Sequence, residues 1–233
     1  MYQHIIQNSW LKQFASRGYV KSVDFHTLNF ELKKPDCIGG DVDFQSEEQE
    51  RNDSKVIESP AIAILHSIKK GKLEPNDTQR GHLNRFVALH MSRSTRDLEN
   101  LKAEGISFKQ AKNVLYESSL LFSSSFPEIW TLHLKEGDER LILSDQPIVR
   151  MEHQILLPYA PKVLICFTDS RGPGVFEDRT WSQAMNEMSI QNSVNSFFCN
   201  PDKHPDLLEL MQRSKRNIII SKECHTLRIP PVI

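Results

Sequence analysis

The stretch Arg140-Leu-Ile-Leu-Ser-Asp-Gln-Pro-Ile-Val149 carries an apolar run into a fixed turn and then into a second apolar pair. Its run 141–143 is typical of a β-strand, and Pro147 cannot donate the backbone hydrogen bond that a continuing strand needs. We therefore expect Asp145 at the exit of a strand. A rigid element aims a side chain at such a point while the loop leaves it accessible, so Asp145 is a candidate functional residue.

The sequence around this stretch predicts a strand-rich half of the chain. Apolar and β-branched residues alternate with turn residues, which is typical of short strands. The Gly137-Asp138 pair predicts a hairpin between the first two strands of this half. The expected elements are strands at 129–134, 140–144, 155–157, 162–167 and 217–220, and helices at 180–198 and 205–213.

Apolar residues recur at helical spacing through the middle of the chain, which predicts a helical centre. The polar stretch 45–58 is expected to be a solvated loop or the exposed start of a helix. The other elements expected before residue 127 are a short helix at 2–15, a hairpin of 19–24 and 27–32, a strand at 42–44 and helices at 56–70, 78–104 and 107–121.

Strands, then helices, then strands again indicate an α+β fold, with a helical central cluster packed on a mostly antiparallel sheet. The length of 233 residues suits a single domain, 1–233. We expect three parts within it: an N-terminal helix and hairpin (1–44), the helical centre (56–121) and a strand-rich part with C-terminal helices (127–233).

Composition indicates a cytoplasmic protein without a membrane partner. The formal net charge is −1, so no global basic field points to nucleic acid. The N-terminus lacks the features of a signal peptide, and no apolar run approaches the roughly 20 residues that span a bilayer. Four widely spaced cysteines do not form a disulfide framework. A zinc site is a weak alternative, because its ligands fit no standard spacing; they would be Cys199, His204, Cys224 and His225.

Several segments, taken in order, resemble a bacterial uncharacterised family catalogued as domain of unknown function 4238. The resemblance covers nearly the whole chain and implies an architecture and a list of polar residues, but no established activity. One departure from the family pattern is Gln7, which stands where the family has a proline. The matching segments are His4-Ile-Ile-Gln-Asn-Ser-Trp-Leu-Lys-Gln-Phe14, Ile57-Glu-Ser-Pro-Ala61, Phe86-Val-Ala-Leu-His-Met-Ser-Arg-Ser94, Trp130, Ser144-Asp-Gln-Pro147, Leu156-Leu-Pro-Tyr-Ala-Pro161 and Val194-Asn195.

The matched polar positions suit phosphodiester hydrolysis if the fold brings them together. Glu58 and Asp145 could share a divalent cation, and His4 could act as general acid or base. Arg93 could bind a phosphate through its bidentate guanidinium. Asn195 and His90 complete the set as substrate-binding residues. This hypothesis describes a nuclease acting on nucleic acid, in the setting of a toxin or of phage defence.

The alternative hypothesis is a non-catalytic binding or interaction protein. In it Arg93 only pairs with Glu58 or Asp145 and joins helix to sheet. The sequence leaves both hypotheses open, and it leaves a homo-oligomer open as well.

Two further patterns carry weaker nuclease interpretations. Arg85 and His90 resemble the Arg-x4-His signature of the HEPN ribonucleases, but residues five apart on a helix point in different directions. Asp24 with Glu31-x-Lys33 resembles the metal-binding core of restriction enzymes. The ordinary interpretation of that hairpin is a charged edge strand.

Overall fold

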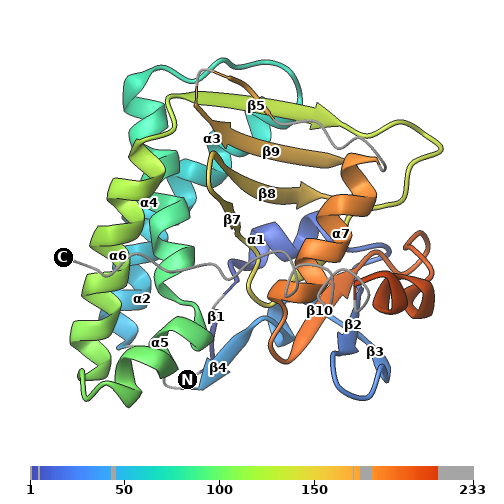
Figure 1. Cartoon of the computed structure of the whole chain (residues 1–233), viewed down its shortest axis with the longest axis horizontal. Coiled ribbons are helices and arrows are strands. Elements are labelled where there is room, and N and C mark those ends of the chain that lie inside the picture. Colours follow the sequence, from blue (N-terminus) through green and yellow to red (C-terminus); the bar gives the residue numbers. More distant parts are fainter. Residues whose placement is uncertain (1, 5, 43–45, 170, 174–179, 215–233) are drawn as a thin grey trace.

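The computed structural model describes residues 2–4, 6–42, 46–169, 171–173 and 180–214, without the side chains of 2–4 and 40–42. Helices gather on one side of the molecule and antiparallel sheets on the other, as Figure 1 shows. The predicted α+β class is confirmed. Among the described residues, no helix is long and apolar enough to cross a membrane.

The N-terminal segment begins as a strand, so the prediction of one helix over 2–15 is wrong. Strand β1 (Tyr2–His4) pairs antiparallel with β4 (Gly40–Val42), and its backbone hydrogen bonds go to that partner. Helix α1 (Asn8–Leu11) and the 3-10 turn η1 (Lys12–Phe14) follow. A second 3-10 turn, η2 (Pro35–Cys37), precedes β4.

The polar stretch after β4 is the start of a helix, which is one of the two alternatives that the sequence left open. Helix α2 (Glu47–Asp53) continues through a π-helical turn, η3 (Ser54–Glu58), into α3 (Ser59–Lys69). The Ser46 hydroxyl accepts a hydrogen bond from the Gln49 N–H and caps α2, and three glutamates in the first turn complement the helix dipole.

The single helix predicted over 78–104 is two helices, α4 (Asp77–Ser92) and α5 (Thr95–Ala103). The break falls at Arg93-Ser94, where Ser94 adopts an extended backbone and its hydroxyl caps α5 through the Asp97 N–H. Helix α6 (Phe108–Ser124) packs along α4 and completes the helical centre (Figure 1).

Two four-stranded antiparallel sheets stand beside the helices. The order of the first is β5-β9-β8-β7, and that of the second is β3-β2-β10-β6. The first comprises β5 (Glu128–His133), β7 (Val149–Met151), β8 (Gln154–Ala160) and β9 (Val163–Thr168). The second comprises β2 (Val20–Asp24), β3 (Phe30–Lys33), β6 (Leu143–Ser144) and β10 (Ser196–Cys199).

The predicted hairpin of β2 and β3 is confirmed, and the hairpin predicted between 129–134 and 140–144 is wrong. Strand β5 pairs with β9, whereas β6 pairs with β10 in the other sheet. The cause is a pair of contacts with residues distant along the chain: the Leu141 N–H donates to the Pro161 carbonyl, and the Ile142 N–H donates to the Asn186 side chain. These backbone groups are therefore committed to partners other than β5.

The helix predicted over 180–198 ends early. Helix α7 (Trp181–Asn192) stops where the next backbone N–H groups turn toward Asp145, and the following residues form β10. Residues 207–214 are helical, close to the prediction for 205–213. The strand predicted at 217–220 lies outside the described residues.

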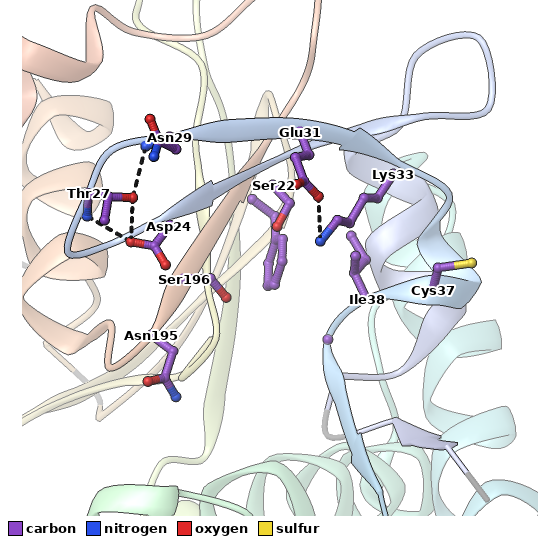
Figure 2. Close-up of a pocket in the computed structure, with 12 residues that line it drawn as sticks. Ser22, Asp24, Thr27, Asn29, Glu31, Lys33, Cys37, Ile38, Asn195 and Ser196 are labelled. Atoms are coloured by element: carbon purple, nitrogen blue, oxygen red, sulfur yellow. Dashed lines mark hydrogen bonds and ion pairs between the residues drawn. The ribbon is translucent and has the colours of Figure 1, made fainter.

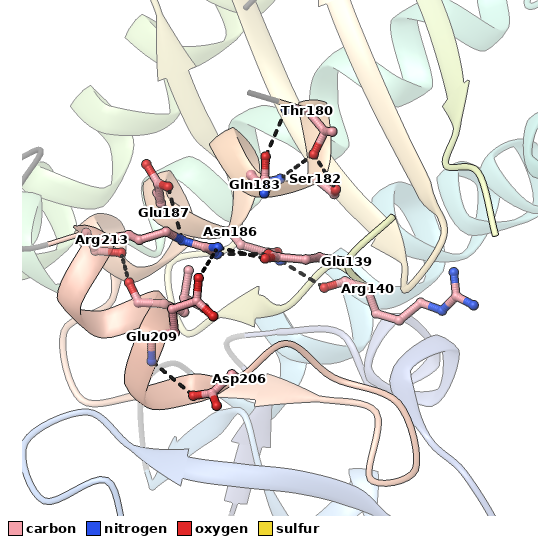
Figure 3. A network of polar contacts seen from close by, with 12 residues as sticks. Glu139, Arg140, Thr180, Ser182, Gln183, Asn186, Glu187, Asp206, Glu209 and Arg213 are labelled. Carbon is pink, nitrogen blue, oxygen red and sulfur yellow. Dashed lines mark hydrogen bonds and ion pairs between the residues drawn. The ribbon is translucent and has the colours of Figure 1, made fainter. Parts of the chain in front are cut away.

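A network around Arg213 holds this last helix against α7 and the segment before β6 (Figure 3). The Arg213 Nη1 lies 2.8 Å from Glu139 Oε1, and Asn186 donates to the Arg140 carbonyl at 2.9 Å. The network borders a small core that contains Phe197 and Leu210. The larger core lies between the helices and the first sheet and includes Trp10, whose indole N–H donates to the Pro158 carbonyl.

Candidate functional site

Three of the predicted site residues, Glu58, His90 and Arg93, meet in a buried cluster. The Arg93 Nη1 lies 2.7 Å from Glu58 Oε1, and Nη2 lies 3.4 Å from Asp53 Oδ2. Glu50 lies 3.9 Å from the same Nη2. The His90 Nε2 lies 3.8 Å from Glu58 Oε1. We call Glu50, Asp53, Glu58, His90 and Arg93 the Arg93 cluster.

The π-helical turn explains why Asp53 and Glu58 reach one guanidinium. Residues five apart point in different directions on an α-helix, but a π-turn closes its hydrogen bond over five residues and brings them nearly into line. The Ser59 N–H donates to the Ser54 carbonyl, which is this longer bond. Asp53 and Glu50 were missed from the sequence, where 45–58 was expected to be solvated. The Ser46 cap and the acidic first turn were the signal for a helix there.

Burial governs the electrostatics of the cluster. Desolvation raises the pKa of Glu58 above its ordinary range, although the charge and hydrogen bond of Arg93 pull it down in part. Lys112 faces the cluster from α6. Burial, together with the nearby charge of Arg93, lowers the pKa of Lys112 to about 8, although the charges of Asp53 and Glu50 act in the opposite direction. The cluster therefore places carboxylates and cations together in a poorly solvated region.

His90 joins the cluster to the N-terminal segment. Its ring packs against Phe86 with centroids 4.4 Å apart and edge-on against Trp10 at 5.3 Å. The segment that begins with β1 is thus anchored beside the cluster through Trp10. His4 lies on β1, and its side chain is outside the described part of the structure.

Asp145 lies at the end of β6, as the sequence predicted, and its carboxylate binds backbone. Oδ1 accepts from the Val194 N–H at 2.9 Å, and Oδ2 accepts from the N–H groups of Asn195 and Ser196 at 2.7 and 2.9 Å. The Asp145 N–H in turn donates to the Ser196 carbonyl. Asp145 and Asn195 are therefore neighbours, and the carboxylate holds the chain between α7 and β10.

A cavity of about 150 Å³ lies next to both groups of predicted residues. His90 and Ser94 contribute to one wall, and Gln146 and Pro147, which directly follow Asp145, contribute to another. The structure brings Glu58, His90 and Arg93 together in one cluster and Asp145 with Asn195 in another; of these five residues, His90 lines the cavity. Their catalytic and substrate-binding roles stay predictions.

A larger groove of about 460 Å³ lies over one face of the second sheet (Figure 2). Asp24, Glu31 and Lys33 line it from β2 and β3, and Asn195 lines it from the loop before β10. The Lys33 ammonium pairs with Glu31 at 2.8 Å. Asp24 Oδ1 accepts the N–H groups of His26 and Thr27, so one of its oxygens is used by the hairpin turn. These bonds hold the pKa of Asp24 below its usual range.

The Arg-x4-His pattern and the zinc alternative gain no support from the described residues. Arg85 is exposed whereas His90 is buried, so the Arg-x4-His pair does not share one surface. Cys199 is buried, and burial raises the pKa of its thiol to about 12. Cys224 and His225 lie outside the described residues. Within the described ranges, no group of three or more His, Cys, Asp or Glu side chains is arranged to hold a metal ion.

Comparisons with protein-family models, with curated proteins and with solved structures found no match for this chain. The resemblance to the uncharacterised family therefore stays a prediction.

Proposed function

We propose that this protein is a non-catalytic interaction protein whose Arg93 cluster and Asp145 stabilise the fold. The observation that carries the proposal is the bonding of Asp145. A carboxylate offers about four acceptor sites, and three of those of Asp145 are taken by backbone N–H groups. A carboxylate bonded in this way is poorly placed to activate water or to bind a cation.

The Arg93 cluster supports the same conclusion. The guanidinium of Arg93 is buried, with Glu58 at 2.7 Å and Asp53 at 3.4 Å. A phosphate would have to displace these carboxylates before Arg93 could bind it. Removing one partner of such a buried pair leaves an uncompensated charge, which strongly destabilises a fold. The cluster thus has a structural role that is independent of any ligand.

The groove on the second sheet is the surface that suits a partner. Among the described residues that line it, the charged side chains are Asp24, Glu31 and Lys33, so carboxylates outnumber ammonium groups there. Nucleic-acid phosphates would meet net repulsion there, since phosphate binding depends on Lys and Arg. A polar partner segment with cationic hydrogen-bond donors, such as lysine side chains, is complementary to the groove.

Binding tests this assignment directly. Fluorescence anisotropy would compare a labelled oligolysine peptide with a labelled single-stranded RNA. We expect the protein to bind the peptide, and Asp24→Asn to weaken that binding. The asparagine oxygen can still accept the turn hydrogen bonds, so the variant changes charge rather than fold. Tighter binding of the RNA would contradict the proposal.

A second candidate function, a hydrolase acting on nucleic acid in a toxin or phage-defence setting, is favoured by one observation. Glu58 has a raised pKa, and its carboxylate lies 3.8 Å from His90, which lines the small cavity. A perturbed carboxyl group beside a histidine at a cavity is the usual setting for general acid–base catalysis.

A nuclease assay separates the two candidates. RNA and DNA would be incubated with the wild-type protein, with and without a divalent cation, and with the His90→Gln variant. The interaction protein is expected to cleave neither substrate. Cleavage that is lost in His90→Gln at an unchanged melting temperature would support the hydrolase instead. The His153→Gln substitution, at a side chain that is 52% exposed, serves as the matched control for preparation and handling.

A further inference from the structure

Strand β3 forms one edge of the second sheet and is bare among the described residues. Within the part of the chain that the structure describes, the sheet order β3-β2-β10-β6 gives β3 a neighbour on one side only. Phe30 and Leu32 are 58% and 57% exposed, far more than apolar residues of a covered strand. An exposed edge of this kind is a template for pairing with another strand.

The hydrogen bonding of β2 with β3 shows which backbone groups of the edge face outward. The Asp24 N–H donates to the Asn29 carbonyl at 2.9 Å, so this pair is hydrogen-bonded. Bonded and non-bonded pairs alternate along an antiparallel ladder. Glu31 and Lys33, which face Ser22 and Val20, therefore direct their backbone groups toward β2. The backbone groups of Phe30 and Leu32 point away from the sheet.

We propose that a second copy of this chain pairs antiparallel along β3, with the two-fold axis passing at Leu32. In this register Leu32 exchanges both backbone hydrogen bonds with the partner's Leu32. Beside this pair, the N–H of the partner's Lys34 donates to the Phe30 carbonyl, while the Lys34 carbonyl keeps its bond to the Cys37 N–H. All of these groups belong to the outward-facing set, because side chains and bonding both repeat every second residue.

The charges of β3 favour the register with its axis at Leu32 over the register with its axis at Glu31. An axis at Leu32 sets Glu31 opposite the partner's Lys33, and Lys33 opposite the partner's Glu31. Opposite charges across a non-hydrogen-bonded pair are close and stabilising, whereas like charges there are destabilising. An axis at Glu31 would set two glutamates opposite each other. The alternating charges of β3 are therefore complementary to a second copy of the same strand.

The pairing would also complete the groove. Glu31 and Lys33 line the groove from β3, which is its outer wall (Figure 2). A two-fold axis perpendicular to the sheet keeps both copies of these side chains on the same face. The partner's Lys33 and Glu31 would thus extend this wall into one continuous sheet surface. The dimer does not depend on the proposed ligand, and its test needs none.

Sedimentation velocity of the full chain over a concentration series tests the pairing. A single edge buries less than the roughly 800 Å² per partner of a stable interface, so we expect a transient, concentration-dependent dimer. Glu31→Lys and Lys33→Glu each place like charges opposite one another twice, and we expect each to raise the dissociation constant about tenfold. The double variant with both substitutions restores opposite charges, and its dissociation constant should be within about twofold of that of the wild type.

Leu32→Pro provides an independent variant. Proline removes the outward N–H at the centre of the interface, while the hydrogen bonds of β3 to β2 are left in place. We expect this variant to be monomeric with the circular dichroism spectrum of the wild type. A monomeric wild type at every concentration, a dimer that survives Leu32→Pro, or a double variant that is no better than the single ones would each overturn the proposal.

Discussion

The Arg93 guanidinium lies 2.7 Å from the Glu58 carboxylate, and both side chains are buried. The pair joins the start of α3 to the end of α4. Asp53 and Glu50 approach the same guanidinium from α2, so one cation compensates several carboxylates of a single helical segment. Without Arg93, Glu58 and Asp53 would therefore be buried without the guanidinium that they contact.

Arg93→Ala should strongly destabilise the protein. The substitution leaves buried carboxylates without their cation, and breaking a buried ion pair from one side costs about 3–5 kcal/mol. Urea unfolding followed by circular dichroism would measure the loss. Arg51→Ala is the matched control, because Arg51 pairs with Glu47 while 79% exposed. Surface pairs contribute about 0–1 kcal/mol. Similar losses in the two variants would contradict the structural role of Arg93.

Glu58 should give the protein a distinctive pH dependence. Its pKa is raised by burial above the value of about 4.3 for glutamate in water. Between these two pKa values the folded protein binds more protons than the unfolded chain, so the free energy of unfolding falls as pH rises. Glu58→Gln lacks this titration. We expect the wild type to lose stability relative to Glu58→Gln as pH rises through this window.

The difference between the two proteins is the quantity to measure, because it cancels the titration of exposed groups such as Asp24 and Glu136. Urea unfolding at a series of pH values from about 4 to 8 would supply it. A difference that is constant across the series, or one that moves in favour of the wild type as pH rises, would show that the pKa of Glu58 is not raised.

Asp145→Asn should loosen the segment between α7 and β10. An asparagine presents one acceptor oxygen and an amide nitrogen, so at least one of the three backbone N–H groups would face a donor. Hydrogen bonds to a charged group contribute about 1.5–3 kcal/mol. We expect faster hydrogen exchange at the amides of Val194, Asn195 and Ser196. Unchanged exchange at these amides would mean that the carboxylate does not hold this segment.

Local sequence rules predicted the elements whose partners are close along the chain. The β2–β3 hairpin and most of the helical centre follow from alternation and from helical spacing, but the break between α4 and α5 at the capping residue Ser94 was missed. The turn at Asp145 was also predicted, because Ser144-Asp145-Gln-Pro147 ends a strand by its own chemistry. The bonding partners of Asp145 lie some fifty residues further along the chain, and nothing in the local pattern identifies them.

Other errors arise where contacts between distant parts of the chain decide the structure. The N–H groups of Leu141 and Ile142 bind Pro161 and Asn186 rather than β5, so a plausible turn at Gly137 did not make a hairpin. The site was predicted in part. Glu58, His90 and Arg93 do converge, but Asp53 joins them through a π-helical turn that no residue pattern in 45–58 predicts.

Cysteine labelling tests the burial of both cores and the accessibility of the groove. Cys37 is exposed and lines the groove, whereas Cys166 and Cys199 are buried. Burial raises the pKa of both buried thiols to about 12, so almost no reactive thiolate forms at pH 8. We expect iodoacetamide to modify Cys37 of the folded protein and to modify Cys166 and Cys199 only in urea, as measured by peptide mass spectrometry.

The protein labelled at Cys37 should also bind the oligolysine peptide more weakly, because the added group occupies the groove. Rapid labelling of Cys166 or Cys199 in the folded protein would contradict the packing of the core that contains it, and unchanged peptide binding after labelling of Cys37 would place the peptide elsewhere.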